Sequence, residues 1–450
     1  MKKIVTVAFL ILVFHFSIFN PLQAQTLTLD SCLVLAQRNN ADILISRLDV
    51  ERAQAVRNQA FTKFFPQIKL GALGYVAARP MISFGLEDVH SNDMRDLLMA
   101  IYEVFSKETD VNDRLELMKR GYSASVVTVQ PVFAGGRIVN GNRLASLGEE
   151  AAELKAQVAM RDVLENVEST FYLVVGLEEK EATVAVALRL IDSLDRVVST
   201  ALANGLVTRS DALQIELKRN EVNAMRQQLK SGIRLSRRLL CNQIGIEYSD
   251  NLNFVQVESA TSPLPVFSNT ETGDFRRPEK RLLQINIESQ ELFKKMTIGE
   301  TLPQLAILGI GYYGNAVRNY AAANAVVGFS LSIPLTDWWE TTHKIREHNI
   351  RIEQARAMQK DYSEKMSLEE EKAYSDMLDA WMLIKSDSAA LGIARENYRL
   401  ANINYAAGNA TISEVLQAYA LLLQAENAIT DRRVSYLVAR RRLSDLRSQR

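Results

Sequence analysis

The chain has 450 residues, of which 47% are hydrophobic and 24% are charged, and its 53 basic residues are matched by 53 acidic ones. This composition is typical of a folded protein, and the length suffices for several domains or one elongated one. A nucleic-acid-binding protein favours a basic surface, so the zero net charge argues against a nucleic-acid partner.

The first 24 residues have the pattern of a secretory signal peptide. Lys2 and Lys3 form the positive end, residues 4–19 are almost wholly apolar, and Ala24 is a small residue at the expected cleavage point. An uncleaved anchor is the alternative, but the apolar run is short for the roughly 20 residues of a spanning helix. Gln25 would follow the cleavage site, and a lipoprotein would need cysteine there. We therefore expect an exported protein in which any membrane crossing is made by strands.

The sequence contains two copies of one plan. Pro131 matches Pro334 at an offset of 203, and the same offset relates residues 205–214 to residues 408–417. A second match relates Pro66-Gln67 to Pro303-Gln304 at an offset of 237. The two offsets differ by 34 residues, which predicts an insertion in the first copy. A repeat of this kind indicates two copies of one supersecondary unit lying side by side.

The first repeat, residues 25–245, is predicted to form a helix, two strands and two further helices. No proline occurs between Pro131 and Pro263, and apolar residues there recur at spacings of three, four and seven, which is typical of amphipathic helices. The expected elements are an opening helix from near Thr28 to about Phe64, a β-hairpin at 66–133 with an inserted loop at about 80–121, a long helix at about 137–203, a tip turn at 204–211 and a helix from Asp211 to about Cys241. Within the insertion, Met94 to Phe105 has helical spacing.

The second repeat, residues 274–450, follows the same plan after a polar connecting segment at 246–273. Its expected elements are an opening helix at about 275–300, a β-hairpin at 303–335, a long helix at about 340–406, a tip turn at 407–414 and a helix from Ser413 to about Arg447. Each long helix ends at a glycine, Gly205 or Gly408, which is a usual helix stop. Thr208 and Thr411 are expected to cap the helices that follow.

The strands alternate between apolar and small polar residues. Val327, Phe329 and Leu331 fall on one face, and Gly328 and Ser330 fall on the other. This pattern suits a strand of a membrane barrel, and a soluble sheet packed on helices is the alternative. Four strands cannot close a barrel, and a membrane-spanning sheet tolerates no free edge. The pattern therefore predicts an oligomer, with two, three or four chains all open at this point.

These features resemble the TolC-type outer-membrane efflux proteins, also called outer membrane factors. The resemblance rests on the duplicated helix–strand–strand–helix–helix plan, on the run Gln130 to Arg137 (QPVFAGGR), and on the two tip turns, Asn204 to Asp211 and Ala407 to Glu414. It implies an α+β membrane protein that forms a homotrimer. Each trimer would have a 12-stranded β-barrel in the outer-membrane lipid of a Gram-negative bacterium, continued by a long periplasmic α-helical tunnel.

The resemblance also implies partners and roles. The chain would be the passive exit duct of a tripartite efflux or type I secretion system, working with a periplasmic adaptor protein and an inner-membrane transporter. The cargo stays open among drugs, metal ions and secreted proteins. The turns that would contact the adaptor are Gly205, Leu206, Val207 and Thr208 in the first copy and Gly408, Asn409, Ala410 and Thr411 in the second.

The resemblance places a gate at the same end of the helices. Tyr405 and Asp211 fall at gate positions, and Glu414 falls on an acidic ring at the constriction. Ala410 replaces the family's gate arginine and Gln417 replaces a second ring carboxylate, so we expect fewer polar links in the closed state. The alternative for Asp211 and Glu414 is a plain helix-start residue stabilised by the helix dipole.

The sequence shows no catalytic constellation. His343 and His348 are five residues apart and share a helix face poorly, so no metal site is expected, and Gly135-Gly136 alone is weak evidence for a nucleotide site. We expect no enzyme activity and no cofactor. The alternative function is an exported coiled-coil scaffold without channel activity. Trp338 and Trp339 suit either a membrane interface or a strand–helix junction, and pairing of Cys32 with Cys241 stays open.

Overall fold

The computed structural model describes residues 26–79, 82–85, 96, 99, 114–117, 120–255, 277–315 and 322–448. The predicted signal peptide lies outside the described residues, and so do nearly all of the helical spacing at Met94–Phe105 and most of the connecting segment. The chain divides into two compact units. The first, here called the helical unit, comprises residues up to Glu51 with Ala151–Gln284 and Ala357–Arg450, and the second, the sheet unit, comprises Arg52–Glu150 and Ile285–Arg356.

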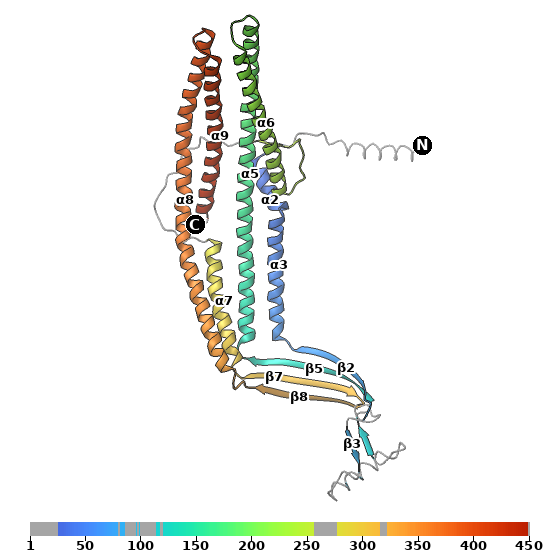
Figure 1. The fold of residues 1–450 in the computed structure, drawn as a ribbon. Coiled ribbons are helices and arrows are strands. Elements are labelled where there is room, and N and C mark those ends of the chain that lie inside the picture. Colours follow the sequence, from blue (N-terminus) through green and yellow to red (C-terminus); the bar gives the residue numbers. More distant parts are fainter. Residues whose placement is uncertain are drawn as a thin grey trace, which may run out of the picture. The chain divides into compact units, whose positions relative to one another are not determined.

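Seven α-helices account for most of the described residues (Figure 1). They are α2 (Leu29–Asn39), α3 (Ala41–Phe61), α5 (Arg137–Ala203), α6 (Arg209–Gln243), α7 (Pro278–Glu300), α8 (Trp338–Ala406) and α9 (Ile412–Ser448). The two long helices, α5 and α8, have 67 and 69 residues. At 1.5 Å per residue each extends for about 100 Å. Among the described helices, none combines the length and apolarity needed to cross a membrane.

The opening helix of the first copy is interrupted, whereas the sequence predicted one continuous helix. Asn40 separates α2 from α3 with an extended backbone, ψ 132°. Its side-chain oxygen accepts the N–H groups of Asp42 and Ile43 at 2.8 and 3.2 Å, so it caps α3. Its amide nitrogen donates to the carbonyl of Gln243 at 2.7 Å. An asparagine that bonds locally in this way competes with helix continuation, which explains the break. A 3₁₀ turn at Thr62–Phe64 ends the segment.

The sheet unit contains one four-stranded antiparallel sheet in the order β2-β5-β7-β8 (Figure 1). Its strands are β2 (Gln67–Val76), β5 (Arg120–Ala134), β7 (Gln304–Gly314) and β8 (Ala322–Ser332). The second hairpin, predicted at 303–335, therefore ends three residues early, at Ser332. Pro334 lacks an N–H for the ladder, which accounts for the early end. Each hairpin contributes two neighbouring strands, so β5 and β7 join the two copies at the centre of the sheet.

The predicted insertion contains a small hairpin. Strand β3 (Ile82–Gly85) pairs with β4 (Arg114–Leu117) in antiparallel register. Both strands lie between β2 and β5 in the sequence, so the insertion leaves the register of the main sheet unchanged.

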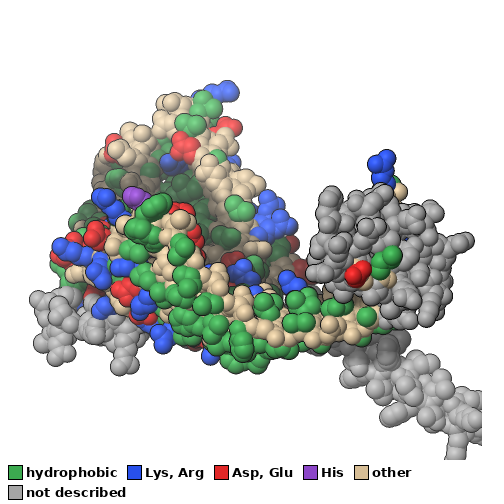
Figure 2. Space-filling view, turned by 90° about the horizontal axis from the view of Figure 1, so that it is seen from below, with side chains coloured by type: hydrophobic (Ala, Val, Ile, Leu, Met, Phe, Trp, Pro, Cys, Tyr) green, Lys and Arg blue, Asp and Glu red, His purple; other side chains and the backbone are tan. Residues whose placement is uncertain are grey.

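One face of the main sheet is apolar and exposed. The register aligns Ile68 of β2, through Thr128 and Gly309, with Val327 of β8. Exposed apolar side chains on this face are Ile68, Leu70, Val126, Phe133, Val327, Phe329 and Leu331. Figure 2 shows hydrophobic side chains gathered in a continuous band on the side of the molecule that it presents. Exposure of such an apolar face is unfavourable in water but carries no such cost in hydrocarbon.

The bend from β5 into α5 depends on glycine. Gly135 and Gly136 have φ values of 62° and 75°, in the left-handed region that favours glycine. A Cβ on Gly135 would lie 2.0 Å from the carbonyl oxygen of Gly299, near the end of α7. The two copies therefore touch backbone to backbone at this point.

The helical unit has a core at the junction of α2, α5 and α6. Buried members of this core are Leu27, Cys32, Ala36, Ile43, Val163, Val167, Phe171, Tyr172, Val174, Leu240, Cys241, Ile244, Leu252, Phe254 and Leu437. A parallel pairing of β1 (Thr26–Leu27) with β6 (Asn253–Phe254) closes the core. This pairing was not predicted, because two-residue strands leave no periodic signal.

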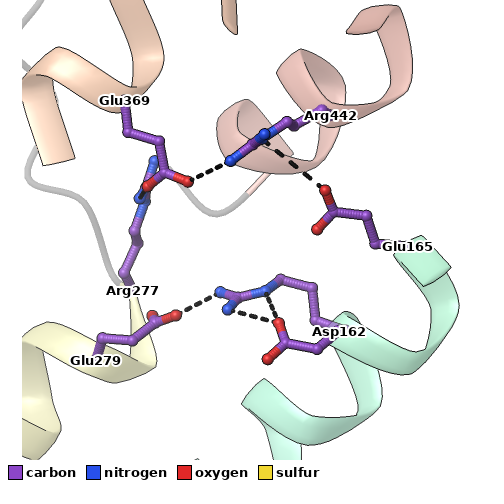
Figure 3. A network of polar contacts seen from close by, with 7 residues as sticks. Asp162, Glu165, Arg277, Glu279, Glu369 and Arg442 are labelled. Atoms are coloured by element: carbon purple, nitrogen blue, oxygen red, sulfur yellow. Dashed lines mark hydrogen bonds and ion pairs between the residues drawn. The ribbon is translucent and has the colours of Figure 1, made fainter. Parts of the chain in front are cut away.

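Ion pairs join the two copies within the helical unit. The Glu369 carboxylate of α8 accepts hydrogen bonds from Arg277 and Arg442, each at 3.2 Å. Arg442 also approaches Glu165 of α5 (Figure 3). Arg161 of α5 pairs with the Glu279 carboxylate of α7 at 2.6 Å. The Arg277 side chain is only 2% exposed, so its charge depends on this network.

A neighbouring pair gives a testable expectation. Arg441 of α9 lies 3.2 Å from Glu168 of α5, whose side chain is 6% exposed, whereas Arg441 is 48% exposed. We expect Arg441→Met to lower the free energy of unfolding by about 1–3 kcal/mol, because a nearly buried carboxylate loses a cation that solvent already partly screens. Thermal unfolding of the purified protein measures this.

Two further variants provide the controls. Arg395→Met removes a well-exposed partner 3.8 Å from Glu426, and we expect almost no change. Glu168→Gln combined with Arg441→Met should recover part of the loss, since no charge then stays buried. Equal losses for Arg441→Met and Arg395→Met would contradict the expectation.

Candidate functional site at the helical tip turns

Two backbone hydrogen bonds close the turn between α5 and α6. Gly205 has φ 68°, and its N–H donates to the Leu202 carbonyl at 3.0 Å. The N–H of Leu206 donates to the Ala201 carbonyl at 2.9 Å. These two bonds form a Schellman motif, which satisfies the last carbonyls of α5. Leu206 itself is 77% exposed at the tip, so a large apolar side chain points into solvent.

The turn between α8 and α9 repeats this motif. Gly408 has φ 74° and donates to the Tyr405 carbonyl at 3.0 Å, and Asn409 donates to the Asn404 carbonyl at 2.8 Å. Asn409 and Thr411 are exposed, and Ala410 is half-buried. The backbones of the two tips are thus alike, while the exposed side chains differ, with Leu206 in one and Asn409 in the other.

A threonine and an acid cap each helix that leaves a tip. Asp211 accepts the N–H and the hydroxyl of Thr208, both at 2.8 Å, and the Thr208 hydroxyl accepts the Asp211 N–H at 3.3 Å. In the second copy, Thr411 accepts the N–H of Glu414 at 3.3 Å, and its hydroxyl donates to the Glu414 carboxylate at 3.2 Å. Both acids therefore stabilise a helix start, which is the alternative weighed from the sequence.

Tyr405 and Asp211 lie near each other, although they come from different copies. Burial raises the pKa of the Tyr405 phenol above its ordinary value, and the Asp211 carboxylate raises it further. Glu414 and Gln417 are exposed on α9, and Glu414 forms hydrogen bonds with Thr411. Tyr405 and Ala212, the residue after Asp211, pack against the same apolar core, and Glu414 bonds to Thr411 at its own cap.

A core of apolar side chains supports both tips. It joins buried residues of α5, α6 and α9, and Tyr405 and Val207 pack against it. The rings of Tyr398 and Tyr419 contact each other at an interplanar angle of 56°, with centroids 5.2 Å apart, and burial raises the pKa of both phenols. Because this core continues along the helices, the tips are held by packing as well as by polar contacts.

Sequence reasoning missed the ion pairs that fasten α5 to α6. Arg219 contacts Asp195 at 2.6 Å, Arg226 contacts Glu181 at 3.0 Å, and Arg237 contacts Glu178 at 2.7 Å. The residue numbers of the arginines rise along α6 while those of their acidic partners on α5 fall, which is the register of two antiparallel helices. Matching opposite charges across the predicted turn could have revealed it.

The comparisons with known proteins bear on this arrangement. Residues 300–447 match the family model described as outer membrane efflux protein. OprN, an outer-membrane channel, aligns with a TM-score of 0.75 at 16% identity over 93% of this chain and 89% of its own. The fold is that of this outer-membrane channel. The resemblance seen in the sequence is thereby confirmed.

Two further solved outer-membrane proteins share this fold. The CmeC outer membrane channel of Campylobacter jejuni aligns with a TM-score of 0.74 at 15% identity, covering 94% of this chain and 85% of its own. The outer membrane protein VceC of Vibrio cholerae aligns with a TM-score of 0.71 at 14% identity, covering 93% and 95%. No curated protein matches the sequence. The family match covers β7, β8, α8 and most of α9, so the second copy carries the clearer sequence signal.

Proposed function

We propose that the protein is the outer-membrane channel of a tripartite efflux or type I secretion system. The carrying observation is the four-stranded sheet, which exposes an apolar face and ends in the two edge strands β2 and β8. Such a sheet is stable in lipid only when its edges are paired. The match of residues 300–447 to the efflux family and the shared channel fold support the same conclusion.

Three copies are proposed to close the barrel. Pairing β8 of one chain with β2 of the next would give twelve strands, within the range known for membrane barrels. The long helices α5 and α8, with their partners, would form the wall of a periplasmic tunnel. Transport through this duct is passive, and a periplasmic adaptor and an inner-membrane transporter supply delivery and energy.

The tips are proposed to contact the adaptor and to control opening. Exposed Leu206 and Asn409 give the two turns different surfaces on equivalent backbones, so an adaptor can distinguish them. Tyr405 and Asp211 are proposed to hold the closed state within each chain. The ring formed by Glu414 in three copies would attract cations at the constriction.

Conductance tests the proposed function. Protein extracted in detergent should have the mass of a trimer and should form ion-conducting pores in planar bilayers. A monomer that stays in solution without detergent, or a trimer that conducts no ions, would support the scaffold alternative.

A tip variant tests the gate. Asp211→Ala removes two hydrogen bonds at the cap and the carboxylate near Tyr405. Loss of a cap costs about 1 kcal/mol, which shifts a closed–open ratio by about fivefold. We expect a higher mean conductance in bilayers. Glu216→Ala, an exposed acid farther along α6, is the matched control and should leave conductance unchanged. Equal behaviour of the two variants would remove Asp211 from the gate.

A further inference from the structure

Two cysteines lie in the core of the helical unit, one on each side of a contact between α2 and α6. We propose that Cys32 and Cys241 form a disulfide in the exported protein. The inference rests on the proposed function, because the oxidising compartment outside the inner membrane is where disulfides form and persist. In the structure both side chains are free thiols, and they are the chain's two cysteines.

The ends of α2 are both fastened to the segment around the end of α6. The Asn40 amide donates to the Gln243 carbonyl at 2.7 Å, and a Cβ on Gly245 would lie 2.5 Å from Asn39. At the other end, the β1–β6 pairing joins Leu27 to Phe254. Figure 1 shows α2 beside the end of α6. Helix α2 is therefore held against the place where Cys241 lies.

The two cysteines point into one core. Cys32 and Ala36, one helical turn apart, form the buried face of α2 and are both 0% exposed. Cys241, next to Leu240 in the last turn of α6, is 1% exposed and belongs to the same cluster. The backbone at Cys241 is fixed, since its carbonyl accepts the N–H of Ile246 at 3.0 Å after Gly245 turns the chain. Both ends of the proposed bond thus have defined positions.

The pKa values of the two thiols support their nearness and indicate when the disulfide forms. Burial, together with the neighbouring Cys241, raises the pKa of the Cys32 thiol to about 12. Burial also raises the pKa of Cys241, against a lowering by Arg237. A charge at one sulfur is therefore felt at the other. Because the thiolate is the reacting species, oxidation belongs to folding, before the core closes, and the folded pair exchanges slowly.

The oxidant of the two cysteines would be a thiol:disulfide oxidoreductase. One cysteine thiolate attacks the disulfide of the oxidoreductase, giving a mixed disulfide and releasing one of the oxidant's sulfurs. The second cysteine thiolate then attacks the sulfur of the first cysteine. The protein loses two protons and two electrons, and the oxidant leaves as a dithiol. The new bond would link α2 to α6 across a loop of about 200 residues, and cross-links that close long loops restrict the unfolded chain most.

The redox state is measured on the full-length protein, recovered in detergent from a Gram-negative host. Acid quenching is followed by denaturation, alkylation with iodoacetamide and intact-mass measurement. We expect no adduct without prior reduction, two adducts after reduction, and one disulfide-linked pair of peptides containing Cys32 and Cys241. Two adducts without prior reduction overturn the proposal.

The same samples separate this inference from the proposed function. Protein found in the outer-membrane fraction with two free thiols rejects the disulfide and leaves the channel proposal intact. Protein absent from the cell envelope rejects the channel proposal itself, and with it the compartment on which the disulfide rests.

Alanine variants supply a second reading. A disulfide is lost only once, so Cys32→Ala, Cys241→Ala and the double variant should lower the unfolding temperature to a similar extent in non-reducing buffer. Dithiothreitol during unfolding should lower that of the wild type and not that of the double variant. Additive losses from the single variants, with no effect of dithiothreitol on the wild type, would show two independent buried thiols.

Discussion

Replacing Gly135 by alanine is expected to remove most of the folded protein from the membrane. The added Cβ would lie 2.0 Å from the carbonyl oxygen of Gly299 and 2.8 Å from its Cα, and atoms of the backbone cannot rotate aside. The left-handed conformation, φ 62°, adds about 1–2 kcal/mol for a residue with a side chain. We expect the free energy of unfolding to fall by about 4 kcal/mol or more, a loss that few single substitutions cause.

The next residue supplies a matched control. Gly136 has a similar backbone, φ 75°, but a Cβ there would meet its nearest atom, of Asn140, at 3.6 Å, an ordinary contact distance. Gly136→Ala should therefore show only the conformational cost. The amount of folded protein in the membrane fraction and the unfolding temperature at one scan rate measure both variants. If the two variants lose the same amount, close packing against Gly299 is not what demands glycine at Gly135.

A charge on the apolar face of the sheet is expected to prevent insertion into the membrane. Phe329 is 79% exposed in the single chain, and the register sets it opposite Ile307 on the apolar face. An arginine on the lipid face of a barrel costs about 2–4 kcal/mol at the middle of the bilayer. If the proposed function holds, Phe329→Arg should therefore lower the amount of the proposed trimer in outer membranes.

Ser330 provides the comparison because it is the next residue on the same strand. Successive residues of a strand point to opposite faces, so Ser330→Arg places the same charge on the other side of the sheet. We expect Ser330→Arg to insert normally and to change the ion selectivity of the pore. Normal insertion of Phe329→Arg would show that this face does not meet lipid.

The helices and turns could be predicted because their signals are local. The prolines predicted where the strands end, and the glycines predicted where α5 and α8 end. These helices end at Ala203 and Ala406, where the Schellman motifs form. The offset of 203 between the copies predicted that Gly205 and Gly408 play the same part, and both have left-handed backbones.

The features that escaped prediction depend on distant partners. Asn40 reads as an ordinary helical residue until its bond to the Gln243 carbonyl is known. The family resemblance assigned Tyr405 and Asp211 to gate positions, but their spacing of almost two hundred residues gives no periodic signal that the Asp211 carboxylate acts on the Tyr405 phenol. The network at Glu369 likewise joins α8, α9 and α5 through side chains that a single helix pattern would assign to solvent.

The seven-residue spacing of buried positions in α5 limits how such a chain can change in length. Val184, Ile191 and Val198 succeed one another at this interval and are 0% exposed. One added residue would rotate everything beyond it by about 100°, because a helix has 3.6 residues per turn. Two turns, or seven residues, return nearly the same face. Relatives that differ in the length of α5 should therefore differ by whole heptads, with equal changes in the helices that pack along it.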